Sequence, residues 1–451
     1  MSIQRLLIIG SDAAGMSAAA QARRRRARDE LEIVVFDRGP YTSWSACGLP
    51  YYVGGLIHDA DQLIARTPEE FRASDIDVQL EHEVVAIDAG ARRLRVRGPD
   101  GERTESFDQL VIATGAVPVR PDLPGADAPG IHGIQNLADG IDLRSDVDSG
   151  RTQAVVVGAG YIGLEMAEAL HRRGLQVRVV ERSEQPMHTL DPDMGALVAD
   201  AIRALGIELH LGTSVEGFAT ASDGRVSAVQ TSAGEFRADL VVLGLGVRPA
   251  SELAENAGLE VGKTGGIVTD PRMATSTEGI WAAGDCVEVF HRVSRRPVAI
   301  ALGTHANKEG RVAGVNATGG DVTFPGVIGT AVTKLCEYEV ARTGLTEREA
   351  NDAGFRVDAA TIESTTRAGY YPESTPITVK VVAEKQTGRL IGAQVIGREG
   401  AAKRIDVLAV AIWNEMTATE FSALDLGYAP PFSPVFDPTL VAAHQVAKSA
   451  R

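Results

Sequence analysis

The chain has 451 residues, 44% of them hydrophobic and 23% charged, and a formal net charge of −15. Domains usually have about 100–200 residues, so this length predicts several domains of ordinary globular composition. The negative charge argues against nucleic acid as a main partner, because phosphate binding needs a positive field. No apolar run reaches the ~18 residues of a membrane span, and the N-terminal strand lacks a signal-peptide pattern. We therefore expect a cytoplasmic protein with no membrane segment.

The first expected unit is a strand, a glycine turn, a helix and a second strand. The apolar strand LLIIG leads into a small-residue helix, and the strand LEIVVFD then ends at Asp37. Gly10 and Gly15 fit a dinucleotide-binding turn, but Asp12 stands where its middle glycine would be. A side chain there would hold a pyrophosphate farther away, and its charge would repel phosphate unless it turned outward. The arginine-rich segment 21–30 is either a solvated helix face or a small site for a phosphate-bearing substrate.

A lone cysteine, Cys47, lies in the next motif, SWSACGLPYYVGG. The chain has three cysteines, too few for a disulfide framework and without metal-ligand spacing, so we expect a reducing compartment and no metal site. Cys47 precedes an expected short helix, whose N-terminus would lower the pKa of the thiol. It is either a small buried filler or a nucleophile, and the motif favours the nucleophile. Cys286 and Cys336 are expected to be packed in the core.

A second unit of the same kind starts at QAVVVGAGYIGLE, and its second strand ends at Glu181. Gly158, Gly160 and Gly163 complete the G-x-G-x-x-G pattern, which allows the tight turn, the approach of a pyrophosphate and close helix–sheet packing. The pyrophosphate would lie at the helix N-terminus, and Glu181 would accept a hydrogen bond from a ribose hydroxyl. Two such units predict two nucleotide-binding domains rather than a repeat array.

Two later segments are expected to be strands that end in polar residues. LVIATGA closes on Thr114 and Gly115, and EGIWAAGDCVEV closes on Gly284 and Asp285. A carboxylate at the end of a parallel strand can accept hydrogen bonds from a polyol such as a ribityl chain.

The C-terminal region predicts an α+β domain. Residues 389–420 are expected to run from a strand into one helix, because apolar residues recur there with helical spacing at Ile405, Leu408, Ala409 and Ile412. The four prolines of segment 427–438 exclude a helix interior or a central strand. This segment is either a disordered terminus or an arm laid on another surface, and its aromatic residues favour the arm.

In this order, the motifs resemble those of the flavin-dependent pyridine nucleotide–disulfide oxidoreductases. The resemblance rests on GSDAAGMSAA, SWSACGLPYYVGG, LVIATGA, VVVGAGYIGLE, LGLGVRPAS, IWAAGDC, EGAAKRIDVLA and YAPPFSP. It is greatest to the single-cysteine branch, which includes coenzyme A-disulfide reductases, NADH oxidases and polysulfide or persulfide reductases. The resemblance implies an α/β fold with two Rossmann-like nucleotide-binding domains, as in glutathione reductase, and a C-terminal α+β dimerisation domain. The implied boundaries are 1–117 and 246–325 for the FAD domain, 118–245 for the NAD(P)H domain and 326–451 for the dimerisation domain.

The resemblance also implies the cofactors and the residues that hold them. FAD is expected near Gly10, Gly15, Asp37, Thr114, Gly115 and Asp285. NADH, with NADPH as the alternative, is expected near Gly158, Gly160, Gly163 and Glu181, and the carboxylate of Glu181 favours NADH because it would repel a 2′-phosphate. The further cofactor-binding residues that it implies are Ala14, Arg38, Ser43, Tyr161, Ile162, Gly246 and Gly284.

The resemblance gives Cys47 a redox role. The second cysteine of the two-cysteine reductases is missing, since residues 48 to 52 are GLPYY. Cys47 must therefore cycle through a mixed disulfide, a persulfide or a sulfenic acid. NAD(P)H would reduce the flavin, and the flavin would reduce the sulfur species held on Cys47. Ala13 stands where related peroxidases and oxidases carry a histidine, which disfavours reduction of peroxide or of oxygen to water.

Other positions bear on the substrate. Tyr428 and Tyr370 match the tyrosine acids of coenzyme A-disulfide reductases, with Tyr371 as an alternative to Tyr370. Ser17, Gln21 and Arg24 match their coenzyme A contacts, and guanidinium groups suit phosphates. Ala46 and Phe436 replace an asparagine and a lysine of that group, which weakens the match.

The sequence therefore predicts an FAD-dependent NAD(P)H oxidoreductase that reduces a small disulfide or persulfide, preferably linked to coenzyme A, through Cys47. One alternative is an NADH oxidase that reduces oxygen at the flavin. Another is an electron-transfer flavoprotein that serves a protein partner. The resemblance also implies a homodimer in which the C-terminal arm reaches the active site of the other subunit.

Overall fold

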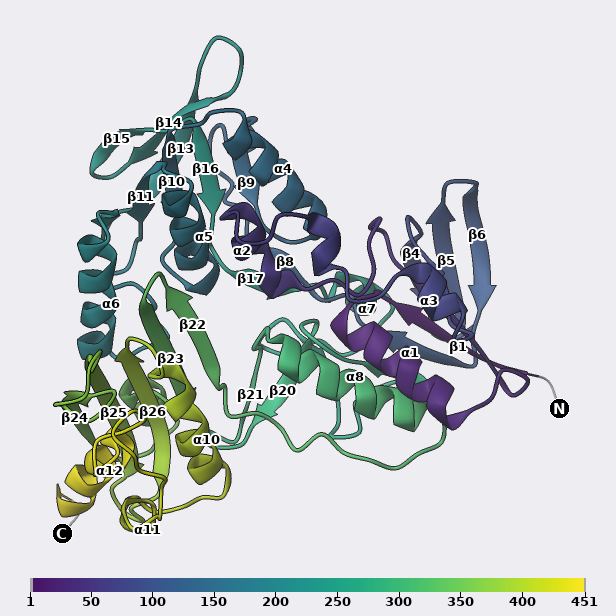
Figure 1. Ribbon diagram of the computed structural model, residues 1–451. Helices are drawn as coiled ribbons and strands as arrows, with labels where there is room; N and C mark the ends of the chain where they lie inside the picture. Colours follow the sequence, from purple (N-terminus) through teal and green to yellow (C-terminus); the bar gives the residue numbers. More distant parts are fainter. Residues whose placement is uncertain (1–2, 450–451) are drawn as a thin grey trace.

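Two parallel sheets and one antiparallel sheet organise the chain, and each lies in a different part of the molecule (Figure 1). The computed structural model describes residues 3–449. It confirms the expected α/β class with two Rossmann-like sheets and a C-terminal α+β region. None of the helices in this part of the chain is long and apolar enough to cross a membrane.

The first parallel sheet has the strand order β19-β7-β1-β2-β3. Its strands are β1 (Gln4–Ile9), β2 (Leu31–Phe36), β3 (Asp77–Gln79), β7 (Gln109–Ile112) and β19 (Ile280–Ala282). The helices α1 (Ala13–Arg25) and α8 (Gly303–Ala317) lie side by side against it (Figure 1). A Cβ atom at Gly310 would lie 2.1 Å from the carbonyl oxygen of Ala14, so only glycine allows these two helices to pack this closely.

The second parallel sheet has the order β12-β11-β10-β16-β9. Its strands are β9 (Ile131–Gly133), β10 (Gln153–Val157), β11 (Gln176–Val180), β12 (Glu208–His210) and β16 (Leu240–Leu243). The long helices of this part are α4 (Leu137–Asp148), α5 (Tyr161–Arg172) and α6 (Pro192–Ala204). In each sheet the strand before the glycine turn, β1 or β10, is the central strand, so both turns open at the carboxyl edge of a sheet.

A two-stranded ribbon connects the two sheets. Strand β8 (Ala116–Pro118) pairs antiparallel with β17 (Val247–Pro249), where the chain leaves the first sheet and where it returns. The hydroxyl of Thr114 donates to the carbonyl of Ala250 at 2.7 Å and so ties both crossings together.

The third sheet is antiparallel, with the order β22-β23-β26-β25-β24. Its elements are β22 (Ala331–Leu335), β23 (Tyr338–Gly344), α9 (Glu347–Asp352), β24 (Val357–Thr365), β25 (Pro376–Glu384), β26 (Leu390–Gly397), η3 (Ala402–Arg404), α10 (Ile405–Trp413), α11 (Ala418–Ser422) and α12 (Pro438–Ser449). Ile405, Leu408 and Ile412 are buried, as the spacing predicts. The expectation of one helix was wrong, because Thr417 forms a capping box with Glu420 and starts a separate helix, α11.

The proline-rich segment is neither a disordered terminus nor the end of the chain. It is a loop, and Pro438 then begins α12, which packs on β24 and β25. Arg404 anchors this loop: its guanidinium donates to the carbonyl of Phe432 at 2.8 Å and pairs with Asp437 at 3.1 Å. Phe432 and Phe436 are 75% and 71% exposed, so the anchored loop presents aromatic side chains outward.

A buried lysine joins the second sheet to the third. The ammonium of Lys380 on β25 lies 2.7 Å from Asp193, 3.4 Å from Asp191 and 2.6 Å from Glu347. Lys380 is 4% exposed, and a charge buried to this degree needs such partners. This cluster fixes the N-terminal turn of α6 against the C-terminal sheet.

The remaining elements are shorter. They are η1 (Ala46–Gly48), α2 (Leu49–Val53), η2 (Ala60–Leu63), α3 (Pro68–Arg72), β4 (Glu83–Asp88), β5 (Arg93–Gly98), β6 (Gly101–Ser106), β13 (Val215–Thr220), β14 (Val226–Thr231), β15 (Gly234–Arg237), α7 (Glu252–Asn256), β18 (Ile267–Val268), β20 (Val287–His291) and β21 (Arg296–Val298).

Candidate functional site

The first glycine turn, between β1 and α1, is built as the sequence predicts. Gly10 has a φ of +102°, and a Cβ atom on it would lie 2.1 Å from the carbonyl oxygen of Ala113. A Cβ atom on Gly15 would lie 1.9 Å from the carbonyl oxygen of Gly10. Asp37, at the end of β2, accepts hydrogen bonds from the amide and the hydroxyl of Ser11 at 2.7 and 2.9 Å. The turn therefore has one conformation, with a carboxylate held against it.

Asp12 does not turn out to solvent. It is partly buried at the start of α1 and makes no capping hydrogen bond with its side chain. Burial and the nearby charge of Asp37 raise the pKa of Asp12 to about 7, and the charge of Asp285 acts in the same direction. The middle position of this turn is thus occupied by a carboxyl group that readily takes up a proton near neutral pH.

The strand ends after β7 and β19 lie beside this turn. Burial raises the pKa of Asp285 to about 6. Gly284 has a φ of +85°, and its amide donates to the carboxylate of Glu309 on α8 at 2.8 Å. Burial also raises the pKa of Glu309 to about 7. The sequence reading missed Glu309; its helical position beside small residues gave no signal that it would lie under a strand end.

The loop after β2 closes the same region. Ser43 has a φ of +49°, and its amide donates to the carbonyl of Ser11 at 2.9 Å. Its own carbonyl accepts from the amide of Ala65 at 2.8 Å. Arg38 is exposed at the edge of this loop. Ser43 therefore links the glycine turn to the segment that carries Cys47.

The second glycine turn, between β10 and α5, repeats this construction. Gly158 has a φ of +101°, and a Cβ atom on it would lie 2.4 Å from the carbonyl oxygen of Gly244. A Cβ atom on Gly163 would lie 2.0 Å from the carbonyl oxygen of Gly158. A Cβ atom on Gly160 would meet nothing within 4 Å. Glu181 accepts from the amides of Ala159 and Ser183, both at 2.8 Å.

Open space lies where cofactors would have to come close to the backbone. Added Cβ atoms on Gly115, Gly160 and Gly246 would meet nothing, although Gly115 and Gly246 have φ of +71° and +85°. Gly160 lies at the N-terminus of α5, whereas Gly115 and Gly246 follow the strands β7 and β16. Each glycine turn also holds a carboxylate, Asp37 or Glu181, and a helix N-terminus with a nearby carboxylate can bind a pyrophosphate and a ribose. Tyr161 and Ile162 are partly buried at the first turn of α5, beside Gly160. The residues present therefore fit a dinucleotide at each turn.

Cys47 lies between these turns, in η1 directly before the short helix α2. The residue is exposed and its thiol is free. Its thiol is nevertheless partly enclosed, and burial together with the carboxylate of Glu165 raises its pKa. The expectation that the helix N-terminus would lower the pKa of the Cys47 thiol was therefore wrong. Helix α2 has five residues, and the surrounding charges are carboxylates rather than bases.

Glu165 and Tyr51 were missed by the sequence reading. Glu165 lies on α5, and its carboxylate accepts from the hydroxyl of Thr333 on β22 at 2.7 Å. Burial raises the pKa of Glu165, and burial and the charge of Glu165 raise the pKa of Tyr51. A small hollow lies beside them; it is lined by Pro50, Tyr51, Gly54, Leu56, Glu165, Glu168, Ala169, Arg172 and Lys334. Helix α2, helix α5 and strand β22, which belong to the three different parts of the chain, thus meet next to Cys47.

The structure brings the two candidate acids, Tyr370 and Tyr428, together. A hydrogen bond with Tyr370 raises the pKa of Tyr428. Both are strongly exposed, at 78% and 46%. The charges that shift the pKa of Cys47 come from Glu165, Asp12 and Asp285, so within one chain neither tyrosine belongs to the immediate surroundings of the thiol.

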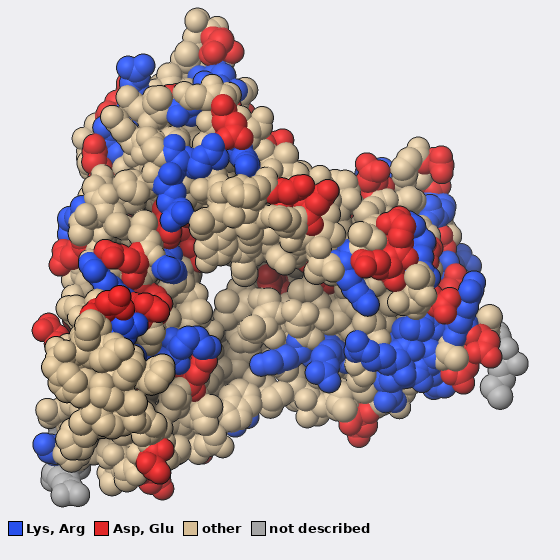
Figure 2. All heavy atoms as spheres, in the orientation of Figure 1, with Lys and Arg blue, Asp and Glu red and all other residues tan. Residues whose placement is uncertain are grey.

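Ser17, Gln21 and Arg24 share one face of α1. The hydroxyl of Ser17 donates to Asn307 on α8 at 2.7 Å, and the Arg24 guanidinium donates to Gln21 at 3.4 Å. Helix α8 adds the exposed Lys308 and Arg311. Figure 2 shows Lys and Arg side chains gathered over α1 and α8, on a chain that is acidic in total. The α8 residues were missed because their neighbours in sequence carry no motif.

The rest of the arginine-rich segment is mainly structural. The guanidinium of Arg23 donates to the carbonyls of Leu31 and Asp75 at 2.8 and 2.9 Å. Arg25 donates to the hydroxyl of Thr318 at 3.0 Å. Only part of the cluster therefore remains for a ligand.

Of the two other cysteines, one is buried as expected and the other is not. Cys286 is 0% exposed, burial raises its pKa to about 11, and the expected packing role is confirmed. Cys336 is partly exposed in the turn between β22 and β23, with a φ of +51°, so the expected core position was wrong. The apolar spacing that suggested a core strand belongs to the strands on either side. Among the residues from 3 to 449, no cluster of possible metal ligands is found.

Residues 4–310 match the pyridine nucleotide-disulphide oxidoreductase family, and residues 330–439 match its dimerisation domain. The chain belongs to this family. It is therefore an oxidoreductase of the kind that uses FAD and NAD(P)H, as expected from its motifs.

Individual relatives match over nearly the whole chain. An NAD(P)H sulfur oxidoreductase (CoA-dependent) of Pyrococcus abyssi is 39% identical over 97% of this chain and 97% of its own length. An NADH oxidase of Methanocaldococcus jannaschii is 36% identical over 98% of this chain and 99% of its own. The structure of an NAD-dependent persulfide reductase from A. fulgidus superposes with a TM-score of 0.96 at 39% identity, covering 99% of this chain and 83% of that chain.

Proposed function

We propose that this oxidoreductase reduces a persulfide or small disulfide linked to coenzyme A, with Cys47 as the residue that holds the substrate sulfur. The observation that carries the proposal is the position of Cys47: a free, exposed thiol between two glycine turns, without a second cysteine in its motif. The names of the relatives from P. abyssi and A. fulgidus support this substrate class. The free state of all three cysteines supports a location in the reducing cytoplasm.

The domain division that we propose follows the sheets. The FAD part comprises 1–117 and 246–325, the NAD(P)H part 118–245 and the dimerisation part 326–451. The β8–β17 ribbon supports the two inner boundaries, since both crossings lie in it. FAD would be held by residues of the first glycine turn, the loop after β2 and the strand ends: Gly10, Ala14, Gly15, Asp37, Arg38, Ser43, Thr114, Gly115, Gly284 and Asp285. NADH would be held by residues at and near the second glycine turn: Gly158, Gly160, Tyr161, Ile162, Gly163, Glu181 and Gly246.

Bound FAD supplies the electron pair that it receives from NADH. The thiolate of Cys47 attacks the substrate disulfide, forms a mixed disulfide and releases one thiolate, which takes up a proton. Two electrons then cleave the mixed disulfide, which restores the Cys47 thiolate and releases the second substrate thiolate, which also takes up a proton. Glu165 acts against early ionisation of Cys47, because its charge raises the pKa of the thiol. Ser17, Gln21 and Arg24, with the basic residues of α8, would bind the phosphates of coenzyme A.

Tyr428, with Tyr370, would donate the proton to the leaving thiolate in the partner subunit. The exposed aromatic residues of the anchored loop 427–437 and the dimerisation domain support a homodimer in which this loop reaches the other active site. The hydrogen bond between the two tyrosines fixes the acid in position, and it also raises the pKa of Tyr428, so that the phenol stays protonated.

The test of the central claim is Cys47→Ser in the FAD-loaded dimer, with coenzyme A disulfide and persulfide as substrates. We expect turnover of both to fall by at least about a hundredfold, because no other thiol in the motif can form the mixed disulfide. Cys336→Ser is the matched control, since Cys336 is a partly exposed thiol in the turn between β22 and β23 and does not line the hollow beside Cys47. Undiminished disulfide reduction by Cys47→Ser would refute the proposal.

The same variant separates the second candidate function. The second candidate is oxygen reduction at the flavin, which the name of the M. jannaschii relative, NADH oxidase, supports. In that case oxygen consumption would persist in Cys47→Ser. If the chain instead served a protein carrier, reduction of an artificial dye would be untouched and disulfide turnover would be absent already in the wild type.

Heterodimers test the reach of the loop. A dimer of one Cys47→Ser chain and one Tyr428→Phe chain contains one intact site only if Tyr428 acts across the interface. We expect about half of the wild-type activity in this heterodimer, although each homodimer is impaired. Activity no greater than the mean of the two homodimers would show that Tyr428 acts within its own chain.

A further inference from the structure

The residues directly before α1 and α5 occupy the same place in the two glycine turns, and only the first has a side chain. Asp12 has φ and ψ of −110° and −153°, and Gly160 has −82° and −170°, so both are extended. A Cβ atom on Gly160 would meet nothing within 4 Å. A side chain at this place therefore leaves the backbone toward the open space in which a cofactor would lie, and Asp12 supplies such a side chain.

The ionisable groups around Asp12 are acids that come from several elements. Burial raises the pKa of Asp12 to about 7, and the charges of Asp37 after β2 and Asp285 after β19 act in the same direction. The thiol of Cys47 is also close, since the charge of Asp12 contributes to its raised pKa. On α8, burial and the charge of Asp285 raise the pKa of Glu309 to about 7. Each of these groups is neutral or negative, so none of them can offset a charge on Asp12.

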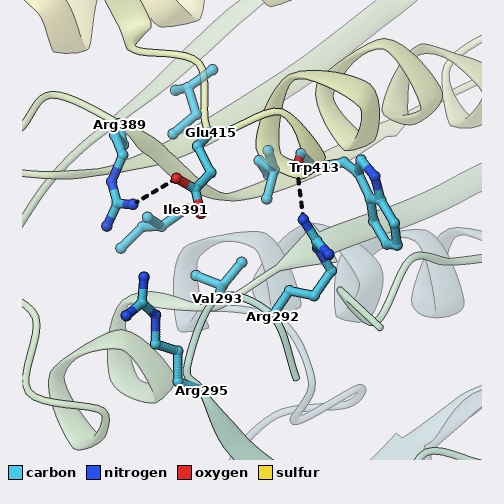
Figure 3. Close-up of a pocket in the computed structure, with 9 residues that line it drawn as sticks. Arg292, Val293, Arg295, Arg389, Ile391, Trp413 and Glu415 are labelled. Carbon is cyan, nitrogen blue, oxygen red and sulfur yellow. Dashed lines mark hydrogen bonds and ion pairs between the residues drawn. The ribbon is translucent and has the colours of Figure 1, made fainter. Parts of the chain in front are cut away.

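Asp12 forms no ion pair with any of residues 3–449. The hollow between the β20–β21 hairpin and the C-terminal domain is different, because guanidinium groups there bind other parts of the chain. Figure 3 shows Arg389 paired with Glu415 at 3.3 Å and Arg292 donating to the carbonyl of Trp413 at 3.5 Å. The volume of that hollow is about 20 Å³, which leaves room for roughly one water. Asp12, by contrast, faces open space without a partner of opposite charge.

A pyrophosphate at the first turn would bring further negative charge to the N-terminus of α1. An ionised Asp12 would repel it, whereas a protonated carboxyl group carries no charge and can donate a hydrogen bond to a phosphate oxygen. We infer that Asp12 binds the FAD pyrophosphate as a neutral carboxylic acid, and that FAD binding therefore takes up one proton from solvent. The inference rests on the proposed assignment of the first turn to FAD and adds a cofactor-binding residue to it.

This role makes the affinity for FAD depend on pH. Bound pyrophosphate raises the pKa of Asp12 above the value of about 7 that it has without FAD. Binding is therefore strongest where Asp12 is already protonated, and it weakens as the pH rises from about 7. One linked proton changes the affinity by at most about tenfold per pH unit. The second turn has Gly160 at this place, so NADH binding should lack this dependence.

Release of FAD from the FAD-loaded chain tests the inference, measured by flavin fluorescence on dilution between about pH 6 and pH 9 at constant ionic strength. The amide of Asp12→Asn donates a hydrogen bond without a proton to lose. We expect the dissociation constant of the wild type for FAD to rise over this range by at least about tenfold relative to that of Asp12→Asn. Asp29→Asn is the matched control and should follow the wild type, since it removes an exposed carboxylate beyond the other end of α1.

Asp12→Ala separates hydrogen-bond donation from the loss of charge. Alanine cannot donate, so Asp12→Ala should have the same pH dependence as Asp12→Asn but bind FAD about tenfold more weakly at each pH. Equal affinity of Asp12→Ala and Asp12→Asn would overturn the inference, and so would a ratio of wild type to Asp12→Asn that does not change with pH.

NADH binding shows whether the assignment of the turns is at fault instead. If Asp12→Asn changes the affinity for NADH and not that for FAD, the inference fails together with the proposed assignment. The turnover of Cys47→Ser with disulfide and persulfide bears only on the proposed function, so the two proposals can fail separately.

Discussion

The two glycine turns have nearly the same backbone geometry and hydrogen bonds, and they differ in sequence at the middle glycine position. Gly10 and Gly158 have φ of +102° and +101°, and each lies against the carbonyl of a neighbouring strand end. In each turn a carboxylate from the next strand accepts a hydrogen bond from the amide after the first glycine: Asp37 at 2.7 Å and Glu181 at 2.8 Å. Strand, turn and acid are thus fixed by the same backbone geometry in both.

The middle position is where the turns differ. Gly160 faces open space, whereas Asp12 fills the same position with a carboxyl group next to Asp37 and Asp285. The comparison teaches that packing determines the outer glycines, while the position that faces the ligand is free to change. A carboxyl group can replace glycine there because it can be neutralised near neutral pH.

The largest effect on stability is expected at the first glycine of each turn, Gly10 or Gly158. Gly10→Ala and Gly158→Ala each place a methyl group 2.1 and 2.4 Å from a backbone carbonyl, at a φ that disfavours alanine. We expect each to lower the free energy of unfolding by about 3–4 kcal/mol or to abolish folding. Urea unfolding and the yield of FAD-loaded dimer measure this.

Gly160→Ala is the matched control for these variants. Its added methyl group meets nothing, so the chain should keep its stability and lose only affinity for NADH. Equal destabilisation by Gly158→Ala and Gly160→Ala would contradict the assignment of packing to the outer glycines and ligand approach to the middle one.

The next effect is a dependence on pH that only the first turn has. The pKa of Asp12 is raised from 3.8 to about 7 in the folded chain, so the folded state holds a proton that the unfolded state has released. Between these pH values the FAD-free protein loses stability as the pH rises. Asp12→Asn removes this loss, because asparagine carries no charge at any pH.

Asp12→Asn should therefore unfold like the wild type below pH 3.8 and be more stable by about 1–3 kcal/mol above the raised pKa. Asp37 and Asp285 face Asp12, and burial raises the pKa of Asp285 and of the nearby Glu309 as well. Only the difference between the variant and the wild type thus reports Asp12. A difference that stays constant with pH would contradict the burial of an ionised carboxylate at this position.

The sequence was most informative where one residue type is required by the backbone. Gly10, Gly15, Gly158 and Gly163 could be predicted because another residue would collide with main-chain atoms. Cys336 was misplaced because apolar spacing does not reveal a two-residue turn. Helix α12 was missed because prolines before it obscured a helix that begins at a proline.

The surroundings of Cys47 could not be predicted for another reason. Glu165 is distant in sequence and approaches only because α5 packs between α2 and β22, where Thr333 holds its carboxylate. Local patterns identify a chemical group, but the pKa of the group depends on charges brought in by the tertiary fold.

The smallest effect concerns the acid at the end of each second strand. Glu181 accepts hydrogen bonds from two backbone amides, and it would also accept one from a ribose hydroxyl if the second turn binds NADH as proposed. Glu181→Gln keeps the size of the side chain but loses the charge, so it should weaken NADH binding by about tenfold, or 1.4 kcal/mol, and bind NADPH relatively better. Asp37→Asn is the counterpart in the first turn and should weaken FAD while leaving the NADH-to-NADPH ratio unchanged. If Asp37→Asn shifted that ratio and Glu181→Gln did not, the assignment of the two turns to FAD and NADH would be reversed.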